Sequence, residues 1–132
     1  MTNILVILVS GGYSSSGALS SVELLQTNGS YHCSLPNLPS YRYSHTQTGF
    51  TLCGGWDSAP PWISRTSCLT LTTSGSWEES YNLTMERDSH CAWASPQGIM
   101  LLGGWDTSSL TTTEILLEDG GTTSGFILDY MT

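Results

Sequence analysis

The stretch Gly54-Gly55-Trp56-Asp57 recurs as Gly103-Gly104-Trp105-Asp106, and a third pair of glycines, Gly11-Gly12, stands before Tyr13. Each pair follows an apolar run, which occupies residues 4–9, 50–53 or 99–102. The first glycines of successive pairs lie 43 and 49 residues apart. A fixed period of this length indicates that the same structural unit is repeated along the chain.

Further features keep the same period. A strand-like segment follows each glycine pair, at residues 22–25, 67–71 and 113–117. An aromatic residue then opens another short strand, and this residue is Tyr31, Trp77 or Phe126. The motif Arg-x-Ser-His leads into the next apolar run at Arg42–His45 and at Arg87–His90.

Together these features resemble the kelch repeat, in which about 50 residues form one four-stranded blade of a β-propeller. The resemblance covers nearly the whole chain and implies an all-β fold of about two and a half antiparallel blades. It places an incomplete blade at residues 1–37, a complete one at 41–82 and a further one at 86–130. In the complete blade it implies strands near 42–48, 50–55, 66–73 and 76–80.

We expect the repeated residues to be structural. The glycines Gly11, Gly12, Gly54, Gly55, Gly103 and Gly104 suit tight turns with positive φ or close backbone approach. Tyr31, Trp77 and Phe126 are expected to fill the space between blades. Arg42 and Arg87 are expected to donate to backbone carbonyls or to a buried carboxylate such as Glu23 or Glu114.

The four cysteines, Cys33, Cys53, Cys68 and Cys91, match no zinc-binding spacing. An even number favours disulfides in an oxidising compartment, and free thiols in an intracellular protein are the alternative. In the blade layout, Cys33–Cys53 is the favoured pair, because both are expected near one face. Cys53–Cys68, across a hairpin, is the main rival.

Two sequons, at Asn28 and Asn82, are candidate glycosylation sites of a secreted protein. The apolar start of the chain lacks the positive region and cleavage site of a signal peptide, so we interpret it as a strand. A secreted protein would then have its signal outside this chain. A cytoplasmic location is the alternative.

Charge restricts the partners. The chain has no lysine, three arginines and a net charge of -8. Such a surface repels phosphate backbones and anionic lipids, so we expect no nucleic-acid binding. No apolar run reaches the roughly 20 residues that a membrane helix needs, so we expect no membrane insertion.

The resemblance implies a non-enzymatic scaffold for protein–protein interactions, as a fragment of a larger secreted propeller with an unknown protein partner. The alternatives are a fragment of a propeller enzyme, similar to galactose oxidase or to a glycosidase, and an intracellular kelch adaptor. We expect no catalytic residue, cofactor or metal site, since His45 and His90 occupy equivalent repeat positions, as do Asp57 and Asp106, which are expected to cap turns. Open blade faces predict self-association. Candidate contact residues lie in loops and are Pro60, Pro61, Trp62 and Leu110.

Overall fold

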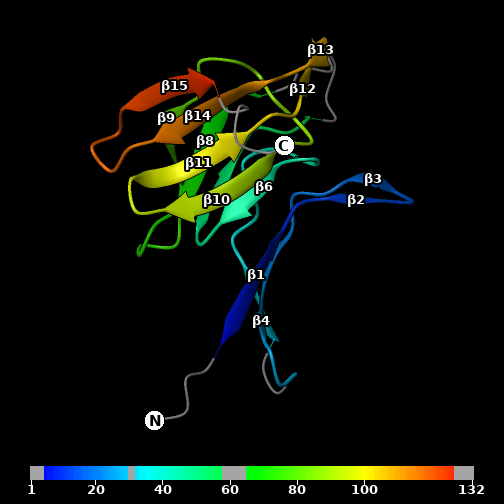
Figure 1. Ribbon diagram of the computed structural model, residues 1–132. Helices are drawn as coiled ribbons and strands as arrows, with labels where there is room; N and C mark the ends of the chain where they lie inside the picture. The colour runs from blue at the N-terminus through cyan, green and yellow to red at the C-terminus, as the bar shows by residue number, and fades with distance from the viewer. Residues whose placement is uncertain (1–4, 30–31, 58–64, 127–132) are drawn as a thin grey trace.

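The computed structural model describes residues 5–29, 32–57 and 65–126. Every regular element in these ranges is a β-strand, and all the strand pairs are antiparallel. Figure 1 shows three larger sheets that follow one another along the chain, with short hairpins beside them. The predicted all-β class is therefore confirmed.

The first sheet has three strands in the order β1 (Val6–Ser10), β4 (Val22–Gln26) and β5 (His32–Leu35). A small hairpin of β2 (Tyr13–Ser14) and β3 (Gly17–Ala18) joins β1 to β4. This hairpin extends away from the sheet, at the end where β1 finishes (Figure 1).

The other two sheets have four strands each. The second runs β6 (Thr46–Thr48), β7 (Thr51–Cys53), β8 (Ser67–Leu71) and β9 (Trp77–Asn82). The third runs β10 (Cys91–Ser95), β11 (Gly98–Leu102), β14 (Thr112–Leu116) and β15 (Thr122–Phe126). The hairpin of β12 (Trp105–Asp106) and β13 (Ser108–Ser109) follows β11, as β2 and β3 follow β1.

The strand predicted to begin at Arg42 begins four residues later, at Thr46. Ser44 has a φ of 54° and its counterpart Ser89 has a φ of 51°, so the chain is not extended through Arg-x-Ser-His. Only an isolated bridge between Tyr43 and Trp56 forms there. The motif is therefore a turn that precedes the strand.

Two hydrophobic cores lie between neighbouring sheets. The core between the first and second sheets is built from Val22, Leu38, Leu52 and Leu69, with Leu8, Leu35 and Trp77 packed against it. The core between the second and third sheets contains Cys53, Cys68, Leu83, Leu101 and Leu116. The second sheet thus buries both of its faces, while the first and third each bury one.

Of the three repeated aromatic residues, the structure describes the packing of Trp77 alone. Trp77 packs on the first core, and its Nε1 donates to the carbonyl oxygen of Pro36 at 2.8 Å. Tyr31 lies outside the described residues, and Phe126 is the last residue of β15. Trp77 therefore fills a space between sheets and also holds the segment that leads from the first sheet to the second.

Candidate functional site: the glycine-pair end of the sheets

A glycine pair follows β1, β7 and β11, so one end of every sheet carries such a pair; we call this the Gly-Gly end. The backbone N–H of Gly12 donates to the carbonyl oxygen of Arg42 at 2.8 Å. The N–H of Gly55 donates to the carbonyl oxygen of Arg87 at 2.9 Å. Each bond joins one sheet to the arginine that introduces the next sheet.

These contacts require glycine. Gly54 has a φ of +66°, and a Cβ atom there would collide with the carbonyl oxygen of Arg87 and the ring of His90. Gly11, with a φ of +56°, would collide with the carbonyl oxygen of Arg42 in the same way. Neither the conformation nor the spacing accommodates a side chain.

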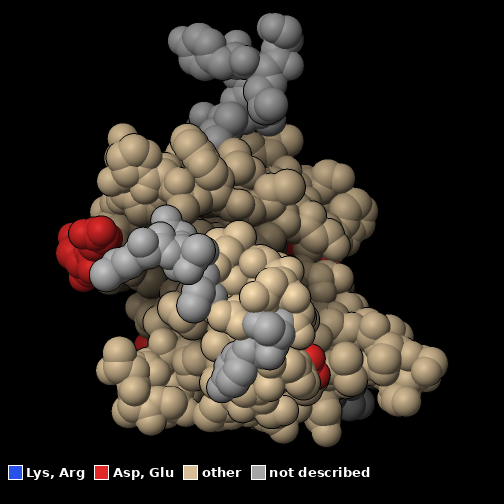
Figure 2. Space-filling view, turned by 90° about the horizontal axis from the view of Figure 1, so that it is seen from below, with Lys and Arg blue, Asp and Glu red and all other residues tan. Residues whose placement is uncertain are grey.

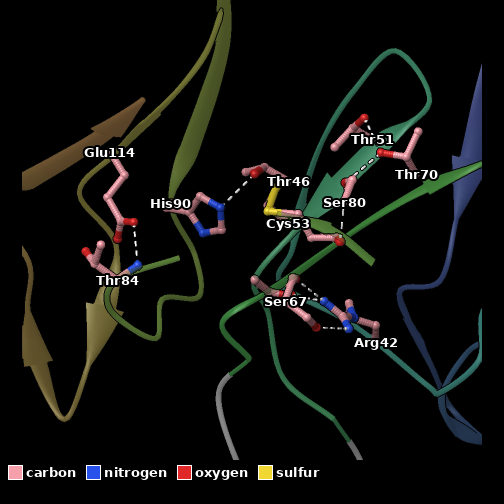
Figure 3. The surroundings of a disulfide bond; sticks show 12 residues. Arg42, Thr46, Thr51, Cys53, Ser67, Thr70, Ser80, Thr84, His90 and Glu114 are labelled. Atoms are coloured by element: carbon pink, nitrogen blue, oxygen red, sulfur yellow. Dashed lines mark hydrogen bonds between the residues drawn. A yellow bond between two sulfur atoms is a disulfide. The ribbon is translucent and has the colours of Figure 1, made fainter. Parts of the chain in front are cut away.

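The two repeat arginines are buried and turn back into their own sheets. Arg42 donates through Nη1 to the carbonyl oxygens of Gly54 (3.1 Å) and Ser67 (2.8 Å), and through Nη2 to the Ser67 hydroxyl (2.9 Å), as Figure 3 shows for Ser67. Arg87 donates to the carbonyl oxygens of Gly103 (2.6 Å) and Thr112 (3.2 Å). Backbone carbonyls are acceptors of the kind predicted from the sequence.

Arg87 also binds a buried carboxylate. Its Nη2 lies 2.9 Å from Oε1 of Glu114, and both side chains are at most 1% exposed. Glu114 also accepts the backbone N–H groups of Thr84 (2.7 Å) and Met85 (3.2 Å), in the segment between the second and third sheets. Three donors therefore stabilise this buried charge.

Glu23 is not a buried carboxylate bound by an arginine, so that prediction is wrong. It is half-exposed, and its Oε2 lies 3.1 Å from Nε2 of His32, not beside an arginine. Arg42 belongs to the second sheet, where Leu69 occupies the position that Glu114 has in the third. The first sheet contains no arginine among its described residues.

Two histidines lie at the boundaries between sheets. Nε2 of His45 is 3.2 Å from the hydroxyl of Ser10, and Nε2 of His90 is 2.7 Å from the hydroxyl of Thr46 (Figure 3). Burial, reinforced by the nearby Arg42 or Arg87, lowers the pKa of each histidine to about 4. Both rings are therefore neutral at neutral pH and tie one sheet to the next.

The disulfide joins Cys53 to Cys68, which are directly opposite each other on β7 and β8 with Cα atoms 4.1 Å apart. The favoured pairing of Cys33 with Cys53 is therefore wrong, and the rival pair is the one that forms. Cys33 belongs to β5 of the first sheet, whereas Cys53 faces the third sheet in the second core. Cys33 and Cys91 are free thiols.

Exposed aromatic rings gather at the Gly-Gly end. Tyr13 and Trp105 each follow a glycine pair and are 69% and 47% exposed, and Tyr41, next to Arg42, is 52% exposed. The ring of Tyr13 contacts that of Tyr43 edge to face at 5.1 Å between centroids. This end therefore combines exposed aromatic rings with buried polar groups, of which Nε of Arg42 and of Arg87 has no hydrogen-bond partner among the described residues.

All three arginines are engaged within the chain, because Arg42 and Arg87 are buried and Arg65 forms an ion pair with Asp57. Figure 2 shows one face of the molecule, where carboxylates are scattered and no basic side chain is visible. The electrostatic character of the surface therefore comes from its acidic groups.

The remaining candidates are placed as follows. Asn28 and Asn82 are both exposed, and Leu110 is partly buried. Pro60, Pro61 and Trp62 lie outside the described residues. Within the described ranges, no three His, Cys, Asp or Glu side chains are grouped so that they could hold a metal ion. The same ranges contain no helix with the length and apolar character needed to cross a membrane.

No model of a known protein family and no curated protein matches the chain. Among solved structures, 78 chains resemble it. One, described as the structure of YjhT, has a TM-score of 0.67 over 91% of this chain, with 14% sequence identity. The chain spans 42% of the length of that protein. At this identity the similarity concerns the fold alone.

Proposed function

We propose that the three sheets are consecutive blades of a kelch-type β-propeller and that the chain is part of a larger ring. The blades are those of the repeat pattern, with an incomplete one at residues 1–37. The shared strand order of the second and third sheets supports this proposal. So does the repeated bond from the second glycine of one sheet to the arginine carbonyl of the next.

The third sheet supports continuation of the array. Gly12 and Gly55 each bond an arginine carbonyl, whereas the equivalent N–H of Gly104 has no partner among the described residues. A further blade that begins with Arg-x-Ser-His would supply that carbonyl. Without such a blade, the outer faces of the first and third sheets are exposed, and the chain alone would self-associate through them.

The propeller acts as a non-enzymatic scaffold that binds a protein through its Gly-Gly end. The observation that carries this proposal is the group of exposed rings, Tyr13, Tyr41 and Trp105, at one end of successive sheets. Tyrosine and tryptophan are enriched where proteins bind one another. The Nη atoms of the two buried arginines bond within the chain and are not available to a partner. The net charge of -8 favours a basic or neutral protein as the partner.

The protein is extracellular in this account. The disulfide between Cys53 and Cys68 is compatible with an oxidising compartment. Exposure of Asn28 and Asn82 supports glycosylation at both sequons. Treatment of the secreted protein with a glycosidase that removes N-linked sugars should lower its mass in two steps, and an unchanged mass would contradict this part of the proposal.

A photo-crosslinking experiment tests the binding function. A photoreactive phenylalanine analogue replaces Tyr13 or Trp105 in the intact protein, and the matched control carries it at Phe50, which is exposed but precedes β7 at the opposite end of its sheet. In extracellular fluid we expect a discrete adduct from the first two positions only. Equal adducts from Phe50, or none from the Gly-Gly end, would contradict the proposal.

A further inference from the structure

Asp88, the second residue of its Arg-x-Ser-His motif, has a buried carboxylate oxygen without a partner. The residue is 4% exposed, and its Oδ1 accepts the hydroxyl of Ser89 at 2.7 Å. Its Oδ2 has no hydrogen-bond partner among the described residues. A buried polar atom that lacks a partner costs free energy, and a donor from a bound molecule would offset that cost.

The backbone places the Asp88 carboxylate beside an exposed indole. Asp88 and Trp105 are directly opposite each other in an antiparallel bridge, and each N–H donates to the carbonyl oxygen of the other, at 3.0 and 2.9 Å. Side chains of directly opposite residues lie on the same face as close neighbours. Trp105 is 47% exposed. The carboxylate of Asp88 is therefore next to an aromatic ring that partly faces solvent.

A second indole approaches Asp88 from the neighbouring sheet. The glycine–arginine bond between the second and third sheets immediately precedes Trp56 on one segment and Asp88 on the other. Between the first and second sheets, the same bond precedes Tyr13 and Tyr43, whose rings lie edge to face at 5.1 Å between centroids. Asp88 therefore puts a carboxylate where the preceding boundary has an aromatic ring, beside a Trp56 side chain that is partly exposed.

No lysine or arginine of the chain is available to this oxygen of Asp88. The chain contains no lysine, Arg42 and Arg87 are buried in their own sheets, and Arg65 pairs with Asp57. The second and third sheets, which meet at Asp88, are both described, so the lack of a donor is not explained by an absent blade. The net charge of -8 attracts a cation from outside the chain.

We propose that Asp88 and the indoles of Trp56 and Trp105 form a binding site for an arginine side chain of the protein that binds the Gly-Gly end. A guanidinium donates to a carboxylate in its plane and stacks its face on an indole, so one group matches both features of the site. Because Oδ2 is shielded from solvent, the half-exposed ring of Trp105 rotates to admit the guanidinium. The inference rests on the protein-binding role proposed for this end.

A short peptide tests the site without the partner. The peptide acetyl-Gly-Arg-Gly-amide is titrated into the intact protein while NMR follows the indole N–H signals of Trp56 and Trp105. The comparison peptide has citrulline, which is uncharged and nearly isosteric, in place of arginine. We expect saturable shifts of both signals with a dissociation constant of about 1 mM, and binding of the citrulline peptide weaker by at least about tenfold. Absence of saturable shifts, or equal affinity for the two peptides, would overturn the proposal.

Matched variants assign the binding to Asp88. Asp88→Asn keeps an oxygen that accepts from Ser89 but removes the charge, so we expect the arginine peptide to bind at least about tenfold more weakly. Asp106→Asn removes one charge from a partly buried residue at the same end and should bind the peptide normally. Equal weakening by the two substitutions would reduce the effect to net charge and contradict the site.

The midpoint of thermal unfolding separates a binding role of Asp88 from a structural one. A carboxylate that the fold needs would lower the midpoint when replaced, whereas an oxygen without a partner would not, so Asp88→Asn should unfold at or above the original temperature. A marked drop would assign Asp88 to the fold and overturn the proposal.

The peptide titration and the photo-crosslinking experiment can fail separately. Protein adducts from the Gly-Gly end without peptide binding would refute the arginine site and leave the protein-binding role in place. Peptide binding without adducts would support the arginine site and refute the protein-binding role.

Discussion

The N–H of Gly55 donates to the carbonyl oxygen of Arg87 across the boundary between the second and third sheets, at 2.9 Å. The side chain of the same arginine turns into the third sheet, where it binds Gly103, Thr112 and Glu114. Arg87 therefore links the second sheet to the third through its backbone carbonyl. Its side chain links the end of β11 to β14 within the third sheet. Gly12 and Arg42 repeat this relationship between the first and second sheets.

Replacing the glycine at this contact should be severe. Gly54→Ala places a methyl group against the Arg87 carbonyl and also imposes a positive φ on alanine. We expect the free energy of unfolding in urea to fall by at least about 3 kcal/mol. Gly75→Ala is the control, because Gly75 also has a positive φ but has nothing within 4 Å of its added Cβ, and it should cost about 1 kcal/mol. Equal losses would show that the close approach is unimportant.

Removing the guanidinium of Arg87 should destabilise the third sheet strongly. Arg87→Met leaves the buried Glu114 without its counter-charge, and we expect a loss of about 3–5 kcal/mol in the same urea titration. The exposed pair of Glu23 and His32 provides the control, since Glu23→Gln should cost less than about 1 kcal/mol.

A double variant separates charge from packing in this cluster. Glutamine at position 114 removes the charge but keeps an acceptor oxygen for the backbone N–H groups of Thr84 and Met85. Arg87→Met combined with Glu114→Gln should therefore recover part of the stability lost in Arg87→Met. A double variant less stable than Arg87→Met alone would contradict the assignment of that loss to an uncompensated carboxylate.

The disulfide should contribute stability that depends on oxidation. Cys53 and Cys68 are 15 residues apart, and closing a loop of that size contributes about 3 kcal/mol. Cys68→Ala should lower the free energy of unfolding by this amount in oxidising buffer only, whereas Cys33→Ala should have the same effect with and without reductant. Alkylation of the native protein should modify two thiols, Cys33 and Cys91. Four modified thiols without reductant would mean that the bond is absent.

The histidines predict an acid-sensitive fold. In the folded protein, burial lowers the pKa of His45 and His90 to about 4, whereas an unfolded histidine has a pKa of about 6.5. The unfolded chain therefore binds more protons between these values, and stability should fall as the pH drops from about 6.5 to about 4. His90→Gln should make the midpoint of thermal unfolding less dependent on pH over this range. An unaltered dependence would assign the effect to other groups.

The strand pattern could be predicted because its signals are local. Gly-Gly marks the end of β1, β7 and β11, and the apolar run before each pair has the length of a strand. The sequence offered Cys53–Cys68 only as the rival disulfide, because the choice between the two pairs depends on register across two strands. Cys68 is opposite Cys53 only because Thr51 is opposite Thr70, and no local signal specifies that alignment.

The contacts at the Gly-Gly end could be predicted only in part, because they also join residues that are far apart in the sequence. The sequence indicated that the arginines bind carbonyl groups, but it did not reveal that their own carbonyl oxygens accept from glycines 30–32 residues earlier, at Gly12 and Gly55. The sequence does show that each Arg-x-Ser-His motif follows a glycine pair at a nearly constant distance, and this regular spacing could have indicated the contact. Glu23 has the same register position as Glu114, but it lies beside His32 and not beside an arginine.

The central claim is that these sheets are blades of a ring larger than this chain. An experimental structure of the full-length gene product tests it most directly. The account predicts a closed propeller in which the N–H of Gly104 donates to an arginine carbonyl and a fourth strand pairs with β1. A structure without further blades, in which Gly104 meets no arginine carbonyl, would contradict it.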